Sequence, residues 1–148
     1  MRLTVRTNIA MRALMTCAVN PEKIVRKAEI AEATGASEAH LGVVINQLAQ
    51  TGFIETIRGR HGGIRLKLAP ELISVGRVFR TFEANTPFTE CFSARDNHCP
   101  IAPVCKLRTS IDDALDAFYS SLDKVTLADL TCDNAGLARL LAVEPATC

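Results

Sequence analysis

The sequence predicts a mostly α-helical fold: a winged helix-turn-helix, a connecting helix, a cysteine-bearing loop and one long amphipathic helix. Three observations support this prediction. Apolar residues recur at spacings of three and four ahead of residue 50, two apolar runs then flank a glycine-rich turn, and a heptad pattern begins near residue 106. A chain of 148 residues buries one core but not two of ordinary size, so we expect one domain with an appendage. The expected units are the winged helix-turn-helix DNA-binding domain at 1–70, the connecting helix and cysteine loop at 71–105, and the dimerisation helix and C-terminal tail at 106–148.

Three helices are expected ahead of the glycine-rich turn. Thr7 is the expected N-cap of the first. The second covers about residues 26–34 and is followed by Gly35, where a left-handed residue stops a helix. Ser37 caps the third helix and Gly52 ends it. Two short helices around a short turn that contains glycine are typical of a helix-turn-helix.

A β-hairpin is expected next, because residues 53–57 and 64–68 are apolar runs suited to strands. The tip between them reads Arg-Gly-Arg-His-Gly-Gly. Guanidinium groups are attracted to the negative potential of a narrow DNA minor groove, so Arg58, Arg60 and His61 are predicted DNA contacts. The alternative is a solvated basic turn.

Charge is divided unevenly along the chain. The net charge is only +1, yet residues 1–70 hold ten Lys and Arg against five acidic residues. Residues 71–148 hold seven against eleven. The first half is therefore the predicted binder of a polyanion, and with a helix-turn-helix the expected partner is double-stranded DNA.

The third helix is the expected recognition helix, the one that enters the major groove in this motif. Its candidate DNA contacts are Ser37, His40, Asn46 and Gln47. Side-chain amides read adenine, and a histidine reaches a phosphate or a base edge. The outward positions of this helix include no Lys or Arg, and polar residues on any exposed helix would look the same. The hairpin tip is therefore the stronger prediction.

Two more helices are predicted beyond residue 70, followed by a short one within 126–141. Ser74 caps the first, which runs to about Glu83. The second begins near Lys106 and carries a coiled-coil spacing of apolar residues. These are Ile111, Leu115, Phe118, Leu122 and Val125. Such a face packs on its own domain or on a partner. We expect a homodimer, because one winged helix reads a single half-site too weakly to be specific.

Three cysteines, Cys91, Cys99 and Cys105, lie within one fifteen-residue segment interrupted by prolines. Their spacing is too wide for the paired cysteines of a zinc knuckle, and three sulfurs leave a fourth ligand unsupplied. An iron-sulfur cluster of the 4Fe-4S type tolerates this better than the 2Fe-2S type, with one iron exposed. The alternative is a zinc site that adds His98 to the three cysteines.

The remaining features narrow the class of protein. Cys17 lies on an apolar helix face and is expected to be a buried, inert thiol, whereas Cys132 and Cys148 have no partner motif. Apolar stretches are too short to span a membrane and the N-terminus lacks a secretory pattern, so a cytoplasmic protein without a membrane partner is expected. Three histidines, no C-x-x-C and no nucleotide loop argue against a thiol enzyme or electron carrier.

Segments across nearly the whole chain resemble one known family, the winged-helix iron-sulfur transcription regulators. The matching segments are Met1-Arg2-Leu3-Thr4, Arg12-Ala13-Leu14, Ile45-Asn46-Gln47-Leu48, Arg58-Gly59-Arg60-His61-Gly62-Gly63, Glu90-Cys91-Phe92, Cys99-Pro100-Ile101-Ala102-Pro103-Val104-Cys105-Lys106-Leu107, Ala117-Phe118 and Thr126-Leu127-Ala128-Asp129-Leu130. Several of them look most like the nitric-oxide-sensing repressors of that family. The seven-residue gap between Cys91 and Cys99 looks more like its iron regulators.

The resemblance implies a homodimeric repressor whose cluster is held by Cys91, Cys99 and Cys105 and which leaves DNA when nitric oxide attacks the iron. A regulator that responds to iron or cluster status is the alternative. In some members an aspartate near the start of the first helix, from the opposite subunit, completes the coordination, and Asn8 stands at the matching position. Because an amide oxygen is a neutral, weaker ligand, a water or an open iron site are alternatives to Asn8.

Overall fold

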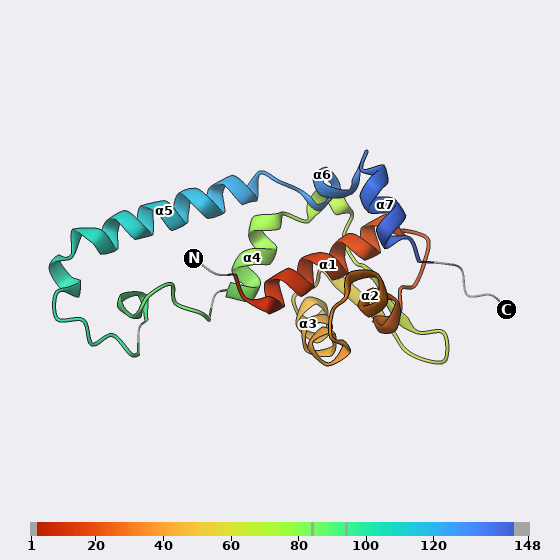
Figure 1. Ribbon diagram of the computed structural model, residues 1–148, viewed down its shortest axis with the longest axis horizontal. Coiled ribbons are helices and arrows are strands. Elements are labelled where there is room, and N and C mark those ends of the chain that lie inside the picture. The colour runs from red at the N-terminus through yellow and green to blue at the C-terminus, as the bar shows by residue number, and fades with distance from the viewer. Residues whose placement is uncertain (1–2, 84, 94, 144–148) are drawn as a thin grey trace.

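The computed structural model describes residues 3–83, 85–93 and 95–143, and it confirms the predicted fold class. The helices are α1 (Val5–Val19), α2 (Lys27–Thr34), α3 (Glu38–Gln50), α4 (Val75–Glu83), α5 (Lys106–Asp123), α6 (Leu127–Thr131) and α7 (Ala135–Leu141). The strands are β1 (Ile54–Ile57) and β2 (Gly63–Leu66), and 3-10 turns cover Pro70–Leu72, Glu90–Phe92 and Ala102–Val104. Figure 1 shows α1 at the centre of the winged helix, with α2 and α3 beside it.

The core of the winged helix forms where α1, α2, α3 and the hairpin meet. Its fully buried side chains include Leu14, Ile30, Leu41 and Phe53. The two strands pair antiparallel, and Val25 forms an additional bridge to Ile64. A Cβ on Gly63 would lie 2.4 Å from the carbonyl oxygen of Val25, so only glycine permits this approach.

Helix ends follow the sequence signals with one exception. Gly35 and Gly52 adopt left-handed φ angles of 66° and 81° where the sequence predicts helix ends. The prediction that Thr7 caps α1 is wrong, because the helix begins one turn earlier and Thr4 is the N-cap. Thr4 accepts a hydrogen bond from the Thr7 amide at 3.3 Å. Thr7 is buried, and its hydroxyl donates instead to Glu83 of α4.

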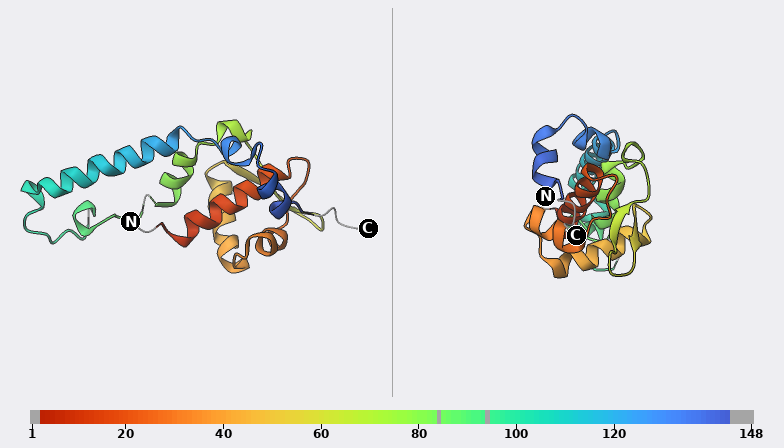
Figure 2. Two further views of the ribbon diagram at one scale, coloured as in Figure 1. Left: turned by 45° about the horizontal axis from the view of Figure 1, so that its top comes forward. Right: turned by 90° about the vertical axis from the view of Figure 1, so that its right-hand side faces the viewer.

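The end of α5 is joined to the start of α4 by backbone hydrogen bonds. The amide of Val75 donates to the carbonyl of Val125 at 2.9 Å, and the amide of Leu127 donates to the carbonyl of Ile73 at 2.8 Å. From this joint α5 projects away from the winged helix, and the segment that follows α4 runs beside it to its start (Figures 1 and 2). We call this projection, described over residues 85–93 and 95–123, the arm.

Two short helices, rather than the one expected within 126–141, return the chain to the winged helix. Asp133, with φ of 54°, lies between them. The Asn20 side chain holds the end of α7 by donating to the Leu141 carbonyl at 2.8 Å and accepting from the Val143 amide at 3.0 Å. Among the helices described, none combines the length and apolar character needed to cross a membrane.

Candidate nucleic-acid interface and cysteine loop

The exposed side of α3 carries three of its four predicted DNA contacts. Ser37 occupies the N-cap position, although its side chain makes no capping hydrogen bond. Ser37, His40 and Asn46 are all exposed. The opposite side of α3 contributes Leu41, Val44 and Leu48 to the core, so the helix presents its polar side outward.

Gln47 does not lie on the outward face where the sequence placed it. The residue is half-buried, and its Nε2 donates to the carbonyl oxygen of Thr81 at 3.1 Å. The side chain therefore ties α3 to α4. A hydrogen bond between residues 34 positions apart leaves no signal in helical spacing, which is why the sequence pattern missed it.

The wing of the fold is the β-hairpin, and its tip, residues 58–63, has a composition and shape suited to DNA contact. Arg58, Arg60 and His61 are exposed. The turn is held by a hydrogen bond of 3.0 Å from the Gly62 amide to the Gly59 carbonyl, and Gly59 has a φ of 111°. Of the ion pairs within the described ranges, none involves the two arginines of the tip. Their charge is therefore available to a phosphate backbone or a minor groove.

The three clustered cysteines lie on the loop between α4 and α5, and all are half-buried free thiols. Cys91 lies in the turn Glu90–Phe92, with the Thr89 hydroxyl 3.0 Å from its sulfur. The Cys99 amide donates to Oδ1 of Asn97 at 3.1 Å. Cys105 is the N-cap of α5, where the helix dipole favours an anion.

These thiols have suitable chemistry for an iron-sulfur cluster, because thiolates are the ligands that such clusters use. In the described part of the chain, no three His, Cys, Asp or Glu side chains converge into a metal-binding arrangement. The ligand set Cys91, Cys99 and Cys105 therefore stays a prediction, as does the zinc set with His98. His98 is exposed.

The start of the cysteine loop is tied to the start of α1 by a cluster that the sequence did not reveal. Oε1 of Glu83, the last residue of α4, accepts hydrogen bonds from the amide and hydroxyl of Thr4, at 2.9 and 3.0 Å, and from the hydroxyl of Thr7. Asn8, the candidate fourth ligand, is the next residue along α1 and is exposed. These hydrogen bonds therefore place Asn8 near the point where the arm follows α4.

A second contact fixes the far end of α5 against α4. Nη2 of Arg80 donates to Oδ2 of Asp123 at 2.8 Å, and the guanidinium lies 4.7 Å from the centroid of the Tyr119 ring. Hydrogen bonding to Arg80 lowers the pKa of the Asp123 carboxyl. Gly76 makes room for this contact, because a Cβ there would lie 2.7 Å from the Asp123 amide nitrogen.

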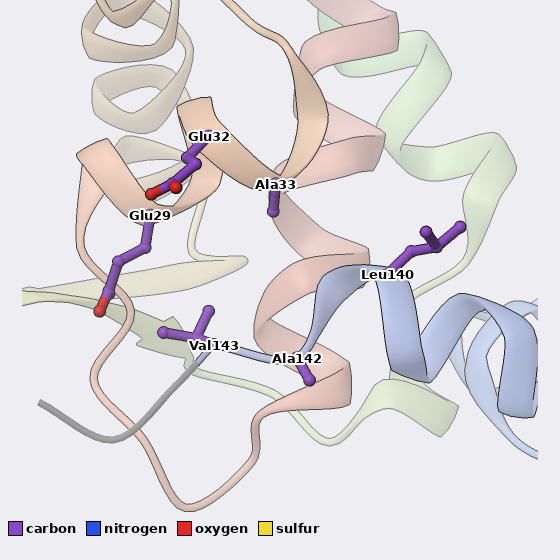
Figure 3. A pocket seen from close by; sticks show the side chains of 6 residues that line it. All are labelled: Glu29, Glu32, Ala33, Leu140, Ala142 and Val143. Atoms are coloured by element: carbon purple, nitrogen blue, oxygen red, sulfur yellow. The ribbon is translucent and has the colours of Figure 1, made fainter.

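A hollow of about 390 Å³ lies between α2 and the end of α7 (Figure 3). Its lining includes Glu29 and Glu32 from α2 and Leu140 from α7. The Glu29 carboxylate already accepts a hydrogen bond from the Arg26 amide at 2.6 Å as part of the helix cap. The hollow shares no lining residue with the cysteine loop or the outward face of α3.

A three-helix core with a basic wing defines a winged-helix DNA-binding protein, here extended by a helical arm. The pattern of the Rrf2 family, described as iron-dependent transcriptional regulator, matches residues 3–133. The chain therefore belongs to the Rrf2 family, and the family resemblance predicted from the sequence is confirmed. This is a family of transcriptional regulators, not of enzymes.

Individual relatives cover almost the whole chain. A regulator named NsrR from Geobacillus kaustophilus is 45% identical over 142 residues, which span 95% of this chain and 97% of that protein. NsrR from Bacillus subtilis is 41% identical over 145 residues, or 97% and 99% of the two chains. The solved structure of IscR from T. potens has a TM-score of 0.71 and 26% identity over 92% of this chain and 90% of its own.

Proposed function

We propose that this protein is a cytoplasmic, homodimeric transcriptional repressor that binds a double-stranded DNA operator and senses nitric oxide through an iron-sulfur cluster. Cys91, Cys99 and Cys105 would hold the cluster, with the 4Fe-4S type favoured over 2Fe-2S. The observation that carries the proposal is the position of these thiols. They lie on the one loop that connects α4, which is tied to the DNA-binding helices, with α5.

Both ends of this loop lie at defined positions in the fold. It starts at Glu83, which is hydrogen-bonded to the first turn of α1, and it ends at Cys105, the N-cap of α5. Thiolates that bind one cluster would shorten the path between these points and so fix the start of α5 relative to the end of α4. When bound, such a cluster supplies the iron that nitric oxide attacks, and releasing the thiolates would relax the loop.

The dimer is supported by the half-buried apolar face of α5. Within the described structure α5 contains no fully buried residue. Ile111, Leu115 and Phe118 line an apolar groove of about 220 Å³, together with Phe88 from the loop. A second copy of α5 would cover this face, and two winged helices at a fixed separation would then read two half-sites. Asn8 of the opposite subunit is the candidate fourth ligand.

A modest coupling suffices for regulation. A difference of about 1–3 kcal/mol between the two loop states would change DNA affinity by roughly 5- to 150-fold. The thiols of Cys91, Cys99 and Cys105 thus need only bias the angle between α4 and α5. The wing and α3 supply the DNA contacts themselves.

A second candidate signal is iron supply, because the family description names iron dependence. The seven-residue gap between Cys91 and Cys99 favours the same candidate through the family resemblance. In this case removal of iron, without nitric oxide, would change DNA affinity. A zinc-structured repressor is the remaining alternative, with His98 as the fourth ligand.

The test is to purify the protein without oxygen, measure iron, sulfide and zinc, and titrate the operator complex with nitric oxide. We expect a coloured dimer that loses operator affinity as the colour bleaches. Cys99→Ala should remove the colour and leave a folded dimer, whereas the matched control Cys132→Ala should keep it. Unchanged affinity after bleaching would contradict nitric-oxide sensing. Loss of affinity on iron chelation alone would favour iron sensing, and a colourless protein with stoichiometric zinc would favour the zinc alternative.

A further inference from the structure

The outward stripe of α3 contains two neighbouring residues that an exposed helix does not favour. Gly42 lies in the middle of the helix, and Val43 leaves 52% of its surface exposed. Ala39 and Asn46 lie one turn before and after them on the same exposed side. Glycine weakens a helix relative to alanine, and a β-branched residue gains nothing from exposure to water.

Nothing in the described fold requires glycine at position 42. A Cβ placed there would have no atom within 4 Å outside its own helix surroundings, and its φ is not left-handed. The contrast with Gly63 and Gly76 is clear, because a Cβ at either position would meet backbone atoms at less than 3 Å. A helical glycine with open space around it permits another molecule to approach the backbone closely.

The surroundings of this stripe point to DNA as that molecule. Val43 is the one large apolar side chain that α3 exposes. Ala39 beside it is small, and the exposed side of the helix otherwise includes the polar Ser37, His40 and Asn46. The basic wing belongs to the same half of the chain, which carries ten Lys and Arg against five acidic residues. A narrow apolar spot among polar residues suits the major groove, whereas a protein partner would need a wider apolar patch.

The major groove presents one aliphatic group to an approaching helix, the C5-methyl group of thymine. We propose that Gly42 and Val43 form a contact surface for a thymine methyl group in each operator half-site. Glycine lets the helix backbone come close to the base edge, and the valine side chain packs against the methyl group. Asn46, one turn further along, is then placed to read a neighbouring adenine. This inference rests on the proposed DNA-binding function and deepens it by naming a specificity determinant.

The test starts from operator DNA that the wild-type protein selects from a random double-stranded library. Each thymine of the selected site is then replaced by deoxyuridine, which removes only the methyl group. We expect one thymine per half-site at which this replacement weakens wild-type binding by roughly 5- to 10-fold. For Val43→Ala the same replacement should change the affinity by less than about twofold, because the partner of the methyl group is absent.

Gly42 gives a second test, in which stability and operator affinity should change in opposite directions. Gly42→Ala should raise the melting temperature, because alanine favours the helix, and weaken operator binding by at least about 5-fold, because the Cβ holds the helix away. Gly136→Ala and Leu140→Ala, both on α7, are matched controls that should leave operator affinity unchanged. Arg60→Ala should weaken binding to thymine and deoxyuridine sites equally.

Three outcomes would overturn the proposal while leaving DNA binding in place. These are a selected site with no thymine methyl dependence, a Val43→Ala protein that keeps the full dependence, and a Gly42→Ala protein that binds as well as the wild type. If the wild-type protein selects no sequence at all, the proposed DNA-binding function fails, and the inference fails with it.

Discussion

Thr7 on α1 donates its hydroxyl hydrogen to the carboxylate of Glu83 on α4, although the two residues are 76 positions apart in the sequence. The same carboxylate oxygen accepts from the amide and hydroxyl of Thr4. One side chain thus holds the first turn of α1 against the last turn of α4. The stability of this contact decides how firmly the cysteine loop is anchored.

Replacing Glu83 by alanine should lower the free energy of unfolding by about 1–3 kcal/mol, because the buried Thr7 hydroxyl would lose this acceptor. Urea denaturation of the wild type and the variant measures the change. Glu22→Ala is the matched control, since Glu22 is exposed in the turn after α1 and should cost little. Equal denaturation midpoints for Glu83→Ala and the wild type would show that the hydrogen bonds of Glu83 do not hold α1 and α4 together.

Gly76→Ala tests the joint between α4 and α5. Alanine favours a helix over glycine, so propensity alone predicts stabilisation by about 1 kcal/mol. The structure predicts the reverse, because the new Cβ would lie 2.7 Å from the Asp123 amide nitrogen and push α5 away, at a cost of about 1–3 kcal/mol. Gly136→Ala, whose Cβ would meet only a side-chain oxygen at 3.8 Å, should be neutral or stabilising. A Gly76→Ala protein as stable as this control would contradict the packing argument.

Cys17 makes stability depend on pH in the alkaline range. Burial raises the pKa of its thiol to about 12 from the ordinary value of 9.0. Above pH 9 the unfolded chain releases a proton that the folded chain keeps. Stability is therefore unaffected by this group below pH 9 and falls as the pH rises toward 12, by at most about 1.4 kcal/mol per pH unit.

Unfolding curves of the wild type and Cys17→Ala, recorded between pH 8 and pH 11, measure this effect. The variant starts less stable because of its smaller side chain, and its curve should lack the thiol-dependent fall. Cys132→Ala should retain the fall, because Cys132 is exposed. Parallel curves for the wild type and Cys17→Ala would rule out the assigned environment.

Leu115→Asp should convert the proposed dimer into a monomer. A carboxylate in the apolar groove formed with Ile111 and Phe118 would lose its hydration when a second α5 packs there. Sedimentation velocity at several protein concentrations measures the oligomeric state, and circular dichroism confirms that the variant is folded. Asp113→Asn changes an exposed residue of the same helix and should remain dimeric. A persistent Leu115→Asp dimer would place the interface elsewhere.

Local patterns predicted most of the fold because its helix and strand signals are short in range. Gly35 and Gly52 ended helices as predicted, and the hairpin formed around its glycine-rich tip. Burial of Cys17 followed from helical spacing alone. The assignment of Thr7 as a cap failed because Thr4, a residue of the same type, precedes it by one turn and competes for the same role.

The candidate site was predictable in composition but not in its supporting contacts. Cys91 and the basic wing stand out in the sequence because unusual residues are close together there. Gln47 looks like a surface residue until α4 is placed beside α3. Glu83 and Thr4 are 79 positions apart, and such pairings arise only when the whole chain is folded.

The isolated β-bridge between Ser74 and Thr126 joins the start of α4 to the end of α5. After α4, which packs against α1 and is hydrogen-bonded to α3, the chain leaves the winged helix as the arm and returns at the end of α5 to the start of α4. A change in the length of the arm would therefore leave the order and packing of the winged-helix elements intact. The proposed sensing loop could thus differ between relatives while the winged helix that carries the proposed DNA contacts is kept.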